Sequence, residues 1–390
     1  MVIIFWLSLA VIIYSYFIYP LILVIFSGLK QAISDTRYLW KKRQRRIVDK
    51  KSLPPVSIII AAYNEESCIK ARVENLLSLD YPQEKLTILI GSDGSQDKTA
   101  EILSSFDEPN VKVHIFTENR GKMSVLNDLV EQANSDYLVF SDANTHFNKN
   151  AIDHLVRHFD HDDIGAVCGE LHLVDVDSGD NKDSVYWRYE QVLKFHEARL
   201  NALQGANGAI YAMRKALFIP LPANTIVDDF QVAMNVAKQG SRLIYDPEAI
   251  AVEEVAPNLQ AEEGRRIRIG LGNYQALFTM TWALNPLLGW RFIAYFSHKV
   301  CRWFVPHFML LTFISNCFLI EDTFYLTTLI CQILFYALAI YGIKQQKNNK
   351  KTSSLISLIA FFVSMNTALL RGFIKYFSSN VQGTWQRTNR

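Results

Sequence analysis

An acid and an amide, Asp142 and Asn144, are the residues of this sequence whose types and spacing most directly suggest chemistry. They follow the apolar run 137–141 (YLVFS), which is typical of a buried strand. Carboxylate and amide oxygens are ligands that hard divalent cations accept in proteins. The pair therefore predicts a metal site at the carboxyl end of a strand.

Two further polar clusters follow apolar runs in the same way. Tyr63 and Glu65 come after the run 56–62, and Asp93 comes after the run 86–90. In parallel α/β sheets, ligands bind at the carboxyl ends of the strands. We therefore expect the three clusters to form a single site.

The sequence around these clusters excludes two common nucleotide-binding patterns. The segment AAYNEE after the first strand contains no glycine, so the GxGxxG pattern of dinucleotide-binding folds is absent. Gly121 and Lys122 are followed by Met123 rather than Ser or Thr, so the P-loop pattern also fails. A bound diphosphate then needs another source of positive charge, and a divalent metal held by oxygen ligands supplies it.

The elements that position these residues alternate between strand and helix. Further strands are expected at 111–116 and at 137–141, and a helix is expected at 122–133. Asn64 and Ser95 are predicted to cap the helices that follow the first two strands. Four strands with intervening helices predict a mainly parallel sheet covered on both faces.

Composition narrows the class of protein. The chain has 390 residues and a formal net charge of +2, which argues against a nucleic-acid partner. Its five cysteines form no CxxC pair and are expected to be reduced. His196 and His298 have no partner at metal-ligand spacing, and they are interpreted as ordinary helix residues.

Apolar segments at both ends predict a membrane protein. Residues 3–26 carry no charge and exceed the length needed to span a bilayer, and a basic segment follows them. The positive-inside rule then places the following region in the cytoplasm. Three more apolar stretches are found at 304–320, 324–343 and 355–377. Counting the membrane crossings places the tail after the last stretch outside the cell, whereas its basic residues favour the inside. A re-entrant or interfacial helix at 355–377 would remove this disagreement.

Seven motifs occur in an order that resembles the membrane-bound family 2 glycosyltransferases, a group that includes bacterial polysaccharide synthases of the cellulose, chitin and hyaluronan synthase type. The motifs are VSIIIAAYNEE, GSDGSQDKT, NRGKMSVLN, SDANT, GANGAIYAMRK, VDDFQVAMNVAKQG and RRIRIGLGNYQAL, within residues 54–280. The resemblance implies a GT-A catalytic fold that takes a nucleotide-activated sugar, expected to be a UDP-sugar, and inverts its anomeric centre.

The resemblance also implies roles for residues of the metal and catalytic motifs. Asp142 and Asn144 match a DxD motif that binds Mg²⁺ or Mn²⁺, with an amide in place of the second acid. Asp229 matches the catalytic base, and Asp228 replaces a longer glutamate of the TED motif. Lys122 matches a lysine near the diphosphate.

Other residues match binding positions of the family. Glu65 and Asp93 correspond to positions that bind the base and ribose, and Tyr63 belongs to the same nucleotide-sugar site. Acceptor or diphosphate contacts are expected from arginines of the RRIRI segment, namely Arg265, Arg266 and Arg268.

The RRIRI segment departs from the QxxRW pattern of processive relatives. An isoleucine, Ile269, stands where they have a tryptophan that stacks on the acceptor sugar. Tyr274, one to two helical turns further on, is a candidate replacement for that aromatic face. The departure predicts addition of one or a few sugars to a glycan or lipid-linked acceptor. A processive synthase making a β-linked homopolymer, a lipid-phosphate sugar transferase and a silent sugar-nucleotide sensor remain alternatives.

The expected product belongs to a cell-surface or extracellular polysaccharide, and the transferred unit is a hexosyl or N-acetylhexosaminyl group. The expected location is the bacterial inner membrane, with the catalytic domain in the cytoplasm. The predicted organisation is a transmembrane anchor (1–28), a basic linker (29–53), a GT-A catalytic domain (54–250), an interfacial segment with RRIRI (251–302), a transmembrane region (303–378) and a polar tail (379–390).

Overall fold

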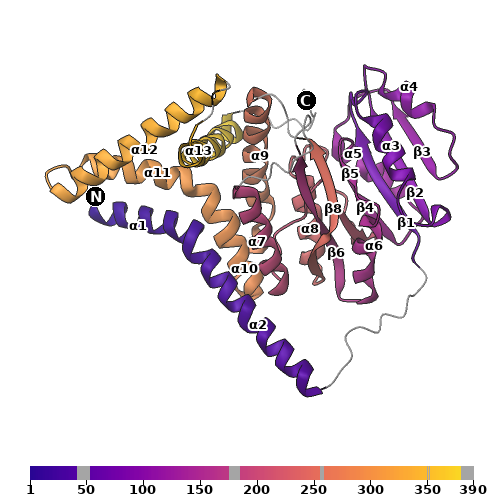
Figure 1. The fold of residues 1–390 in the computed structure, drawn as a ribbon, viewed down its shortest axis with the longest axis horizontal. Helices are drawn as coiled ribbons and strands as arrows, with labels where there is room; N and C mark the ends of the chain where they lie inside the picture. The colour runs from indigo at the N-terminus through magenta and orange to yellow at the C-terminus, as the bar shows by residue number, and fades with distance from the viewer. Residues whose placement is uncertain (42–52, 175–184, 255–258, 349, 351, 379–390) are drawn as a thin grey trace.

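The four predicted strands form one parallel half of a sheet (Figure 1). The computed structural model describes residues 1–41, 53–174, 185–254, 259–348, 350 and 352–378. β1 pairs in parallel with both β2 and β4, and β2 pairs in parallel with β3. The strands are β1 (Val56–Ala62), β2 (Leu86–Asp93), β3 (Val111–Phe116) and β4 (Tyr137–Phe140). The expected parallel sheet is confirmed for this half.

The second half of the sheet contains both parallel and antiparallel strands, whereas the sequence predicts a mainly parallel sheet. The strand order is β3-β2-β1-β4-β7-β6-β8-β5. β7 pairs antiparallel with β4 and β6, β8 runs parallel to β6, and β5 pairs antiparallel with β8. These strands are β5 (His146–Phe147), β6 (Ile164–Val174), β7 (Tyr211–Arg214) and β8 (Arg242–Glu254). Their pairing joins segments that are distant in sequence.

Helices bury both faces of the sheet. Along β1, Ile58 and Ile60 pack into the core on one face, while Ile59 and Ala61 pack into the core on the other. This alternation follows from the two-residue period of a strand. One face is covered by α3 (Ile69–Leu77), α4 (Thr99–Ser104) and α6 (Ala151–Val156), and the other by α5 (Lys122–Gln132) and α8 (Asp228–Lys238).

The two predicted helix caps are wrong. Helix α3 begins at Ile69 and α4 begins at Thr99, and both begin several residues after the predicted caps. Asn64 instead adopts a positive φ of 54°, and its side-chain oxygen accepts a hydrogen bond from Gln96 N at 2.8 Å. Ser95 Oγ accepts one from Asn64 N at 3.1 Å. The two residues join the loops after β1 and β2. A hydrogen bond between neighbouring loops uses the same side-chain oxygen that would otherwise cap a helix.

Within the described residues, three long helices are apolar enough to cross a membrane. The first is a continuous helix made of α1 (Val2–Ile13), a π-helical segment (Tyr14–Ile18) and α2 (Tyr19–Lys41). The others are α12 (Thr323–Lys347) and α13 (Ser354–Ser378). The remaining helices of this region are α7 (Val185–Arg199), α9 (Leu259–Thr279), α10 (Trp290–Ala294) and α11 (Cys301–Cys317). The basic segment 42–52 and the polar tail 379–390 lie outside the described residues.

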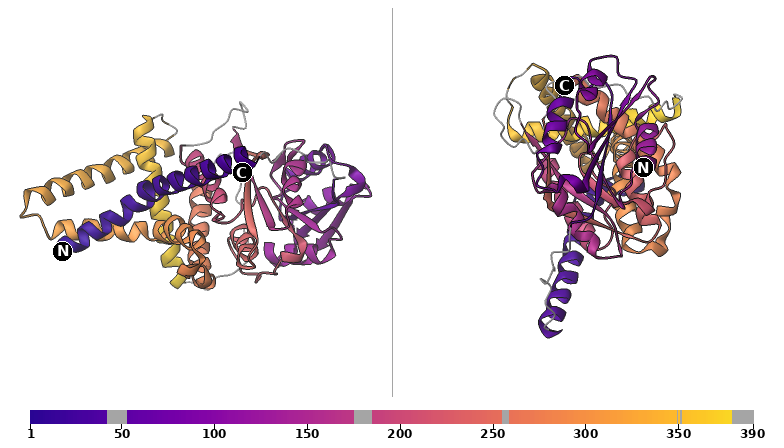
Figure 2. Two further views of the ribbon diagram at one scale, coloured as in Figure 1. Left: turned by 90° about the horizontal axis from the view of Figure 1, so that it is seen from below. Right: turned by 90° about the vertical axis from the view of Figure 1, so that its right-hand side faces the viewer.

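Helix α13 runs across the direction of α11 and α12 and packs along α9 (Figures 1 and 2). The contact is closest at two glycines, Gly270 on α9 and Gly372 on α13. A Cβ on Gly372 would lie 2.6 Å from the backbone nitrogen of Leu271. The absence of side chains at this crossing lets the two backbones touch.

Candidate active site

One lysine and three aspartates, Lys122, Asp142, Asp228 and Asp229, form what we call the carboxylate cluster. Lys122 Nζ lies 2.8 Å from Asp142 Oδ1 and 3.2 Å from Asp228 Oδ2. Asp142 follows β4, Lys122 begins α5, and Asp228 and Asp229 begin α8. Burial lowers the pKa of the lysine, but the charges of Asp142 and Asp228 outweigh burial and raise it above its usual value.

Asp229 is held by two backbone N–H groups. Its Oδ2 accepts a hydrogen bond from Gly208 N, and its Oδ1 accepts one from Phe230 N, both at 2.7 Å. Burial and the charge of neighbouring Asp228 raise the pKa of the Asp229 carboxyl above its ordinary value. A fixed carboxylate with a raised pKa is suited to accept a proton.

Gly208 separates Asp229 from Asp142. A Cβ at this position would lie 3.3 Å from Asp229 Oδ2 and 3.4 Å from Asp142 Oδ2. Both carboxylates therefore face the same small volume, which a side chain would fill. This glycine leaves room for reacting atoms between the predicted base and the predicted metal ligand.

The residues present fit a divalent cation. Asp142 is partly exposed, with 34% of its side chain accessible, and Asn144 is half-buried beside it. Both supply oxygen donors, which suit Mg²⁺ or Mn²⁺ when substrate phosphates complete the coordination shell. Lys122 already places one positive charge against Asp142, so it partly neutralises this carboxylate and competes with a bound cation.

Asp93 is fully buried and holds the loop that carries Lys122. Its two carboxylate oxygens accept hydrogen bonds from the backbone N–H groups of Arg120 and Gly121, both at 2.9 Å. Gly94 lies next to it with φ +65°, and a Cβ there would be 2.5 Å from Asn119 N. The buried acid thus fixes Lys122 through the backbone, and its expected contact with a nucleotide stays a prediction.

Tyr63 and Glu65 lie half-buried in the loop after β1. Glu65 N donates to Thr99 Oγ1 at 2.7 Å, and Cys68 Sγ donates to the Glu65 carboxylate at 3.2 Å. These contacts hold the loop at the same sheet edge as Asp93. The structure therefore brings the predicted nucleotide residues to one edge of the sheet.

The three predicted arginines lie on α9. Arg266 stacks over the Phe361 ring of α13 at 4.9 Å, and Arg265 is half-buried. Arg268 is exposed and lies within electrostatic range of Asp228 and the other acids of the carboxylate cluster. Among the three, Arg268 is the one best placed to meet an anionic ligand there.

Tyr274 does not offer an aromatic face to a sugar. Its side chain is fully buried, its hydroxyl donates to Trp303 O, and its ring meets Phe304 and Phe373 edge to face. It joins α9 to α11 and α13. The suggestion that it replaces the missing tryptophan is wrong in this structure.

Arg72 is a buried residue that the sequence reading missed. Its guanidinium donates to Ser141 Oγ at 2.7 Å, directly before Asp142, and Ser141 Oγ donates to Ala209 O at 2.7 Å. Burial lowers the pKa of Arg72 to about 9, which leaves it charged near neutral pH. The sequence feature that could have indicated its burial is the position of this arginine on the apolar face of α3, next to Val73.

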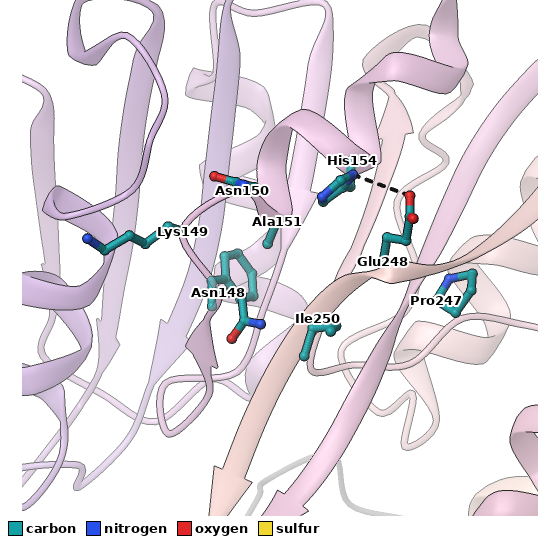
Figure 3. A pocket seen from close by; sticks show the side chains of 9 residues that line it. Asn148, Lys149, Asn150, Ala151, His154, Pro247, Glu248 and Ile250 are labelled. Atoms are coloured by element: carbon teal, nitrogen blue, oxygen red, sulfur yellow. Dashed lines mark ion pairs between the residues drawn. The ribbon is translucent and has the colours of Figure 1, made fainter.

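A pocket of about 630 Å³ opens elsewhere on the sheet (Figure 3). It lies between α6 and β8, where His154 Nδ1 is 3.8 Å from Glu248 Oε2. Its walls include Asn148, Asn150 and Ile250. Its lining residues differ from those of the carboxylate cluster, so the candidate site is identified by its charged side chains and not by this cavity.

Comparisons with known proteins bear on the family and the fold of the chain. Residues 57–218 match the family described as glycosyl transferase family 2. The chain is 28% identical over 256 residues to a poly-β-1,6-N-acetyl-D-glucosamine synthase of Staphylococcus aureus, a match that covers 62% of this chain and 60% of that protein. A synthase of the same name from Staphylococcus epidermidis is 24% identical over 241 residues, covering 58% and 57% of the two chains. This chain thus spans about three fifths of the length of these relatives.

A solved structure shares the fold over almost the whole chain. It is a mannosyltransferase from Pyrobaculum calidifontis in complex with GDP-mannose and Mn²⁺, with a TM-score of 0.71 and 18% identity, covering 96% of this chain and 99% of the other. The predicted GT-A architecture with flanking apolar helices is confirmed by this likeness and by the family match. The chain therefore has the GT-A fold, and its residues 57–218 match glycosyl transferase family 2.

Proposed function

We propose that this protein is an inverting glycosyltransferase that moves a sugar from a nucleoside-diphosphate donor to a glycan or lipid-linked acceptor. The observation that carries the proposal is the arrangement of Asp229 and Asp142 on two sides of Gly208, with Lys122 against Asp142. The proposed proton acceptor and the proposed cation ligand each have an oxygen within 3.4 Å of the point that a Gly208 Cβ would occupy. Transfer of a sugar needs both, because a hydroxyl must lose a proton while a diphosphate leaves.

In this mechanism Asp229 takes the proton from the acceptor hydroxyl as that oxygen attacks C1 of the sugar. The N–H groups of Gly208 and Phe230 hold the carboxylate in one orientation. Its raised pKa makes it a stronger base than an exposed aspartate. Lys122 supplies positive charge near the diphosphate, and Asp228 helps to place the lysine.

Asp142 and Asn144 would hold Mg²⁺ or Mn²⁺. When bound, such a cation acts as a Lewis acid that stabilises negative charge on the departing diphosphate. The Mn²⁺ present with GDP-mannose in the Pyrobaculum calidifontis protein supports this assignment. Tyr63, Glu65 and Asp93 are assigned to the nucleotide, and Arg268 to the diphosphate or the acceptor.

The proposed product is short, with one or a few sugars added to each acceptor. Ile269 stands at the position of the stacking tryptophan and is exposed, while Tyr274 is buried and cannot replace it. A second candidate is a processive synthase of an N-acetylglucosamine polymer. The names of the staphylococcal relatives favour this second candidate.

We further infer that the catalytic domain faces the cytoplasm of a bacterial cell. Trp6 near the start of the anchor helix donates to the Tyr325 hydroxyl at 3.2 Å, so Met1 and the turn before α12 lie at the same end of the bundle. Lys344 and Lys347 end α12 at the other end, which is the cytoplasmic end by the positive-inside rule. Helix α13 lies across α11 and α12, an orientation that supports an interfacial helix.

The experiment that tests the function uses the full chain in detergent or nanodiscs. It is incubated with labelled UDP-N-acetylglucosamine, UDP-glucose or GDP-mannose and Mn²⁺, and the size of the product is measured. Transfer of a few sugars to an added acceptor supports the proposal. A high-molecular-weight polymer that one glycan-specific hydrolase digests would establish the synthase instead, and binding without any transfer would point to a sensor.

A further inference from the structure

A fully buried carboxylate, Glu197, lies where the membrane helices meet the catalytic domain. One of its oxygens, Oε1, accepts a hydrogen bond from the Tyr19 hydroxyl at 2.8 Å and lies 2.7 Å from His298 Nδ1. Tyr19 belongs to the anchor helix and His298 to the helical segment before α11. A single carboxylate on α7 therefore ties the N-terminal helix to the segment before α11.

The other oxygen of Glu197 reaches toward the active site. Oε2 accepts a hydrogen bond from the backbone N–H of Gln204 at 3.3 Å. Gln204 opens the loop 204–208, which ends at Gly208, the residue whose N–H holds Asp229. The five residues of this loop thus connect the hydrogen bond of the buried carboxylate to the hydrogen bond of the proposed base.

The loop has little freedom between these two ends. Gly205 has φ +86°, and a Cβ there would lie 2.4 Å from the Phe230 ring, so the loop packs directly against the residue after Asp229. The Gln204 side chain is 3% exposed and donates to Ala202 O and to Arg291 O. A shift at Glu197 is therefore transmitted along the loop instead of being absorbed by it.

The rest of the junction keeps Glu197 and His298 in place. His298 Nε2 lies 3.2 Å from Glu190 Oε2, and Arg302 donates to Glu190 Oε1 at 2.6 Å. The side chains of His298 and Arg302 are 2% and 8% exposed, so both polar groups are almost completely removed from water. Buried groups of this kind are costly unless each is paired, and here the pairing fixes one arrangement of α7 against the N-terminal helix and the segment before α11.

We propose that Glu197 is a positioning residue through which the anchor helix, by way of Tyr19, sets the orientation of the catalytic base. This role goes beyond the sugar transfer proposed above and rests on it, because its effect is read out on the base Asp229. The Tyr19 hydroxyl and the Glu197 carboxylate hold the loop 204–208, and the loop's last N–H group holds Asp229. When this hydrogen-bond chain is broken, the carboxylate reorients while the nucleotide and metal residues stay in place.

The test compares two tyrosine-to-phenylalanine variants of the full chain in the same membrane mimic. Tyr19→Phe removes the hydroxyl that binds Glu197. Tyr325→Phe removes a hydroxyl that also ties the anchor helix to the bundle, through Trp6, at the far end. The chemical change is the same, and only the first variant breaks the path to the loop.

We expect Tyr19→Phe to lower kcat by about 10- to 100-fold, since a small misplacement of a catalytic group costs that much. Its affinity for the nucleotide should match that of Tyr325→Phe, whose kcat should equal that of the wild type. Its melting temperature should fall further than that of Tyr325→Phe, because the bond to Glu197 is buried and the bond to Trp6 is only partly buried. In Glu197→Ala both acceptors are gone and the path is already broken, so adding Tyr19→Phe to it should cause no further loss. A wild-type kcat in Tyr19→Phe, or equal losses in the two phenylalanine variants, would overturn the proposal.

Hydrogen–deuterium exchange gives a readout that does not need sugar transfer. Backbone amides of residues 202–210 should exchange faster in Tyr19→Phe and at the wild-type rate in Tyr325→Phe. If the wild type transfers no sugar, the proposed function fails, while the exchange experiment still decides the coupling. Unchanged exchange in Tyr19→Phe would refute the coupling whatever the activity.

Discussion

Replacing Asp229 by asparagine tests the assignment of the base most directly. The amide keeps nearly the same shape as the carboxylate but cannot take a proton from the acceptor hydroxyl. Loss of a general base typically costs about 10²- to 10⁴-fold in rate. The first expected effect is therefore a fall in kcat of this size with no change in nucleotide affinity.

The structure adds a second cost to this substitution. Both oxygens of Asp229 accept backbone hydrogen bonds, from Gly208 N and from Phe230 N, at 2.7 Å each. An asparagine can accept only one of them, because its amide nitrogen is a donor. The unpaired, partly buried N–H lowers the free energy of unfolding by about 1–3 kcal/mol. A denaturant titration reads this second cost, while the fall in kcat stays within the general-base range.

Asp228→Asn serves as the matched control. Asp228 contacts Lys122 at 3.2 Å but does not face Gly208, so we expect a loss of about tenfold or less. Initial rates at saturating donor give kcat, and calorimetric titration with the nucleoside diphosphate gives the affinity. An Asp229→Asn variant within tenfold of the wild type, or a larger loss in Asp228→Asn, would refute the reasoning.

Three further outcomes are expected. Lys122→Met should weaken binding of the nucleoside diphosphate but strengthen binding of Mn²⁺ alone in calorimetry, because the ammonium that neutralises Asp142 and Asp228 is gone; a weaker Mn²⁺ affinity would contradict this. Asp142→Ala should abolish transfer without lowering the melting temperature, and excess chelator should do the same to the wild type; full activity in chelator would exclude a metal requirement. Burial raises the pKa of Asp246, but its bonds to His158 and Arg157 outweigh burial and hold the pKa below the ordinary value. Its contribution is therefore present above about pH 4 and lost as the pH falls further. Asp246→Asn should thus lower the free energy of unfolding by about 1–3 kcal/mol at pH 7 and by less near pH 3 in denaturant titrations.

Local pattern was sufficient for the parallel half of the sheet. Strands β1, β2 and β4 are short apolar runs that end in a polar cluster, and a run buried on both faces has to be apolar throughout. Their carboxyl ends meet at one edge in any such sheet. Residues 56–62 and Asp142 could therefore be placed from sequence, as could the apolar segments at the two ends of the chain.

Local sequence pattern did not predict three features of the structure. These are the roles of Asn64 and Ser95, the antiparallel strands and the burial of Tyr274. Asn64 and Ser95 accept hydrogen bonds from backbone N–H groups of each other's loop and not from the N–H groups of the helices that follow them. Two loops that meet offer the same kind of donor as the start of a helix. Tyr274 has the spacing of an exposed platform, yet the packing of α9 against α11 and α13 buries it. Spacing along a helix states which residues share a face, and only the neighbouring helices decide which face is covered.

The sequence by itself determined the family motifs, the strand ends that carry Asp142 and the apolar helices, because each depends on residues that are close together in the chain. Tertiary structure alone decided which distant groups meet. Gly208 holds Asp229 across 21 residues, and Tyr19 binds Glu197 across 178. No periodicity spans such separations, and the contacts form only when helices and sheet pack at van der Waals distance. Short motifs supply the residue types of the site, while the packing of the helices and the sheet determines how these residues are placed.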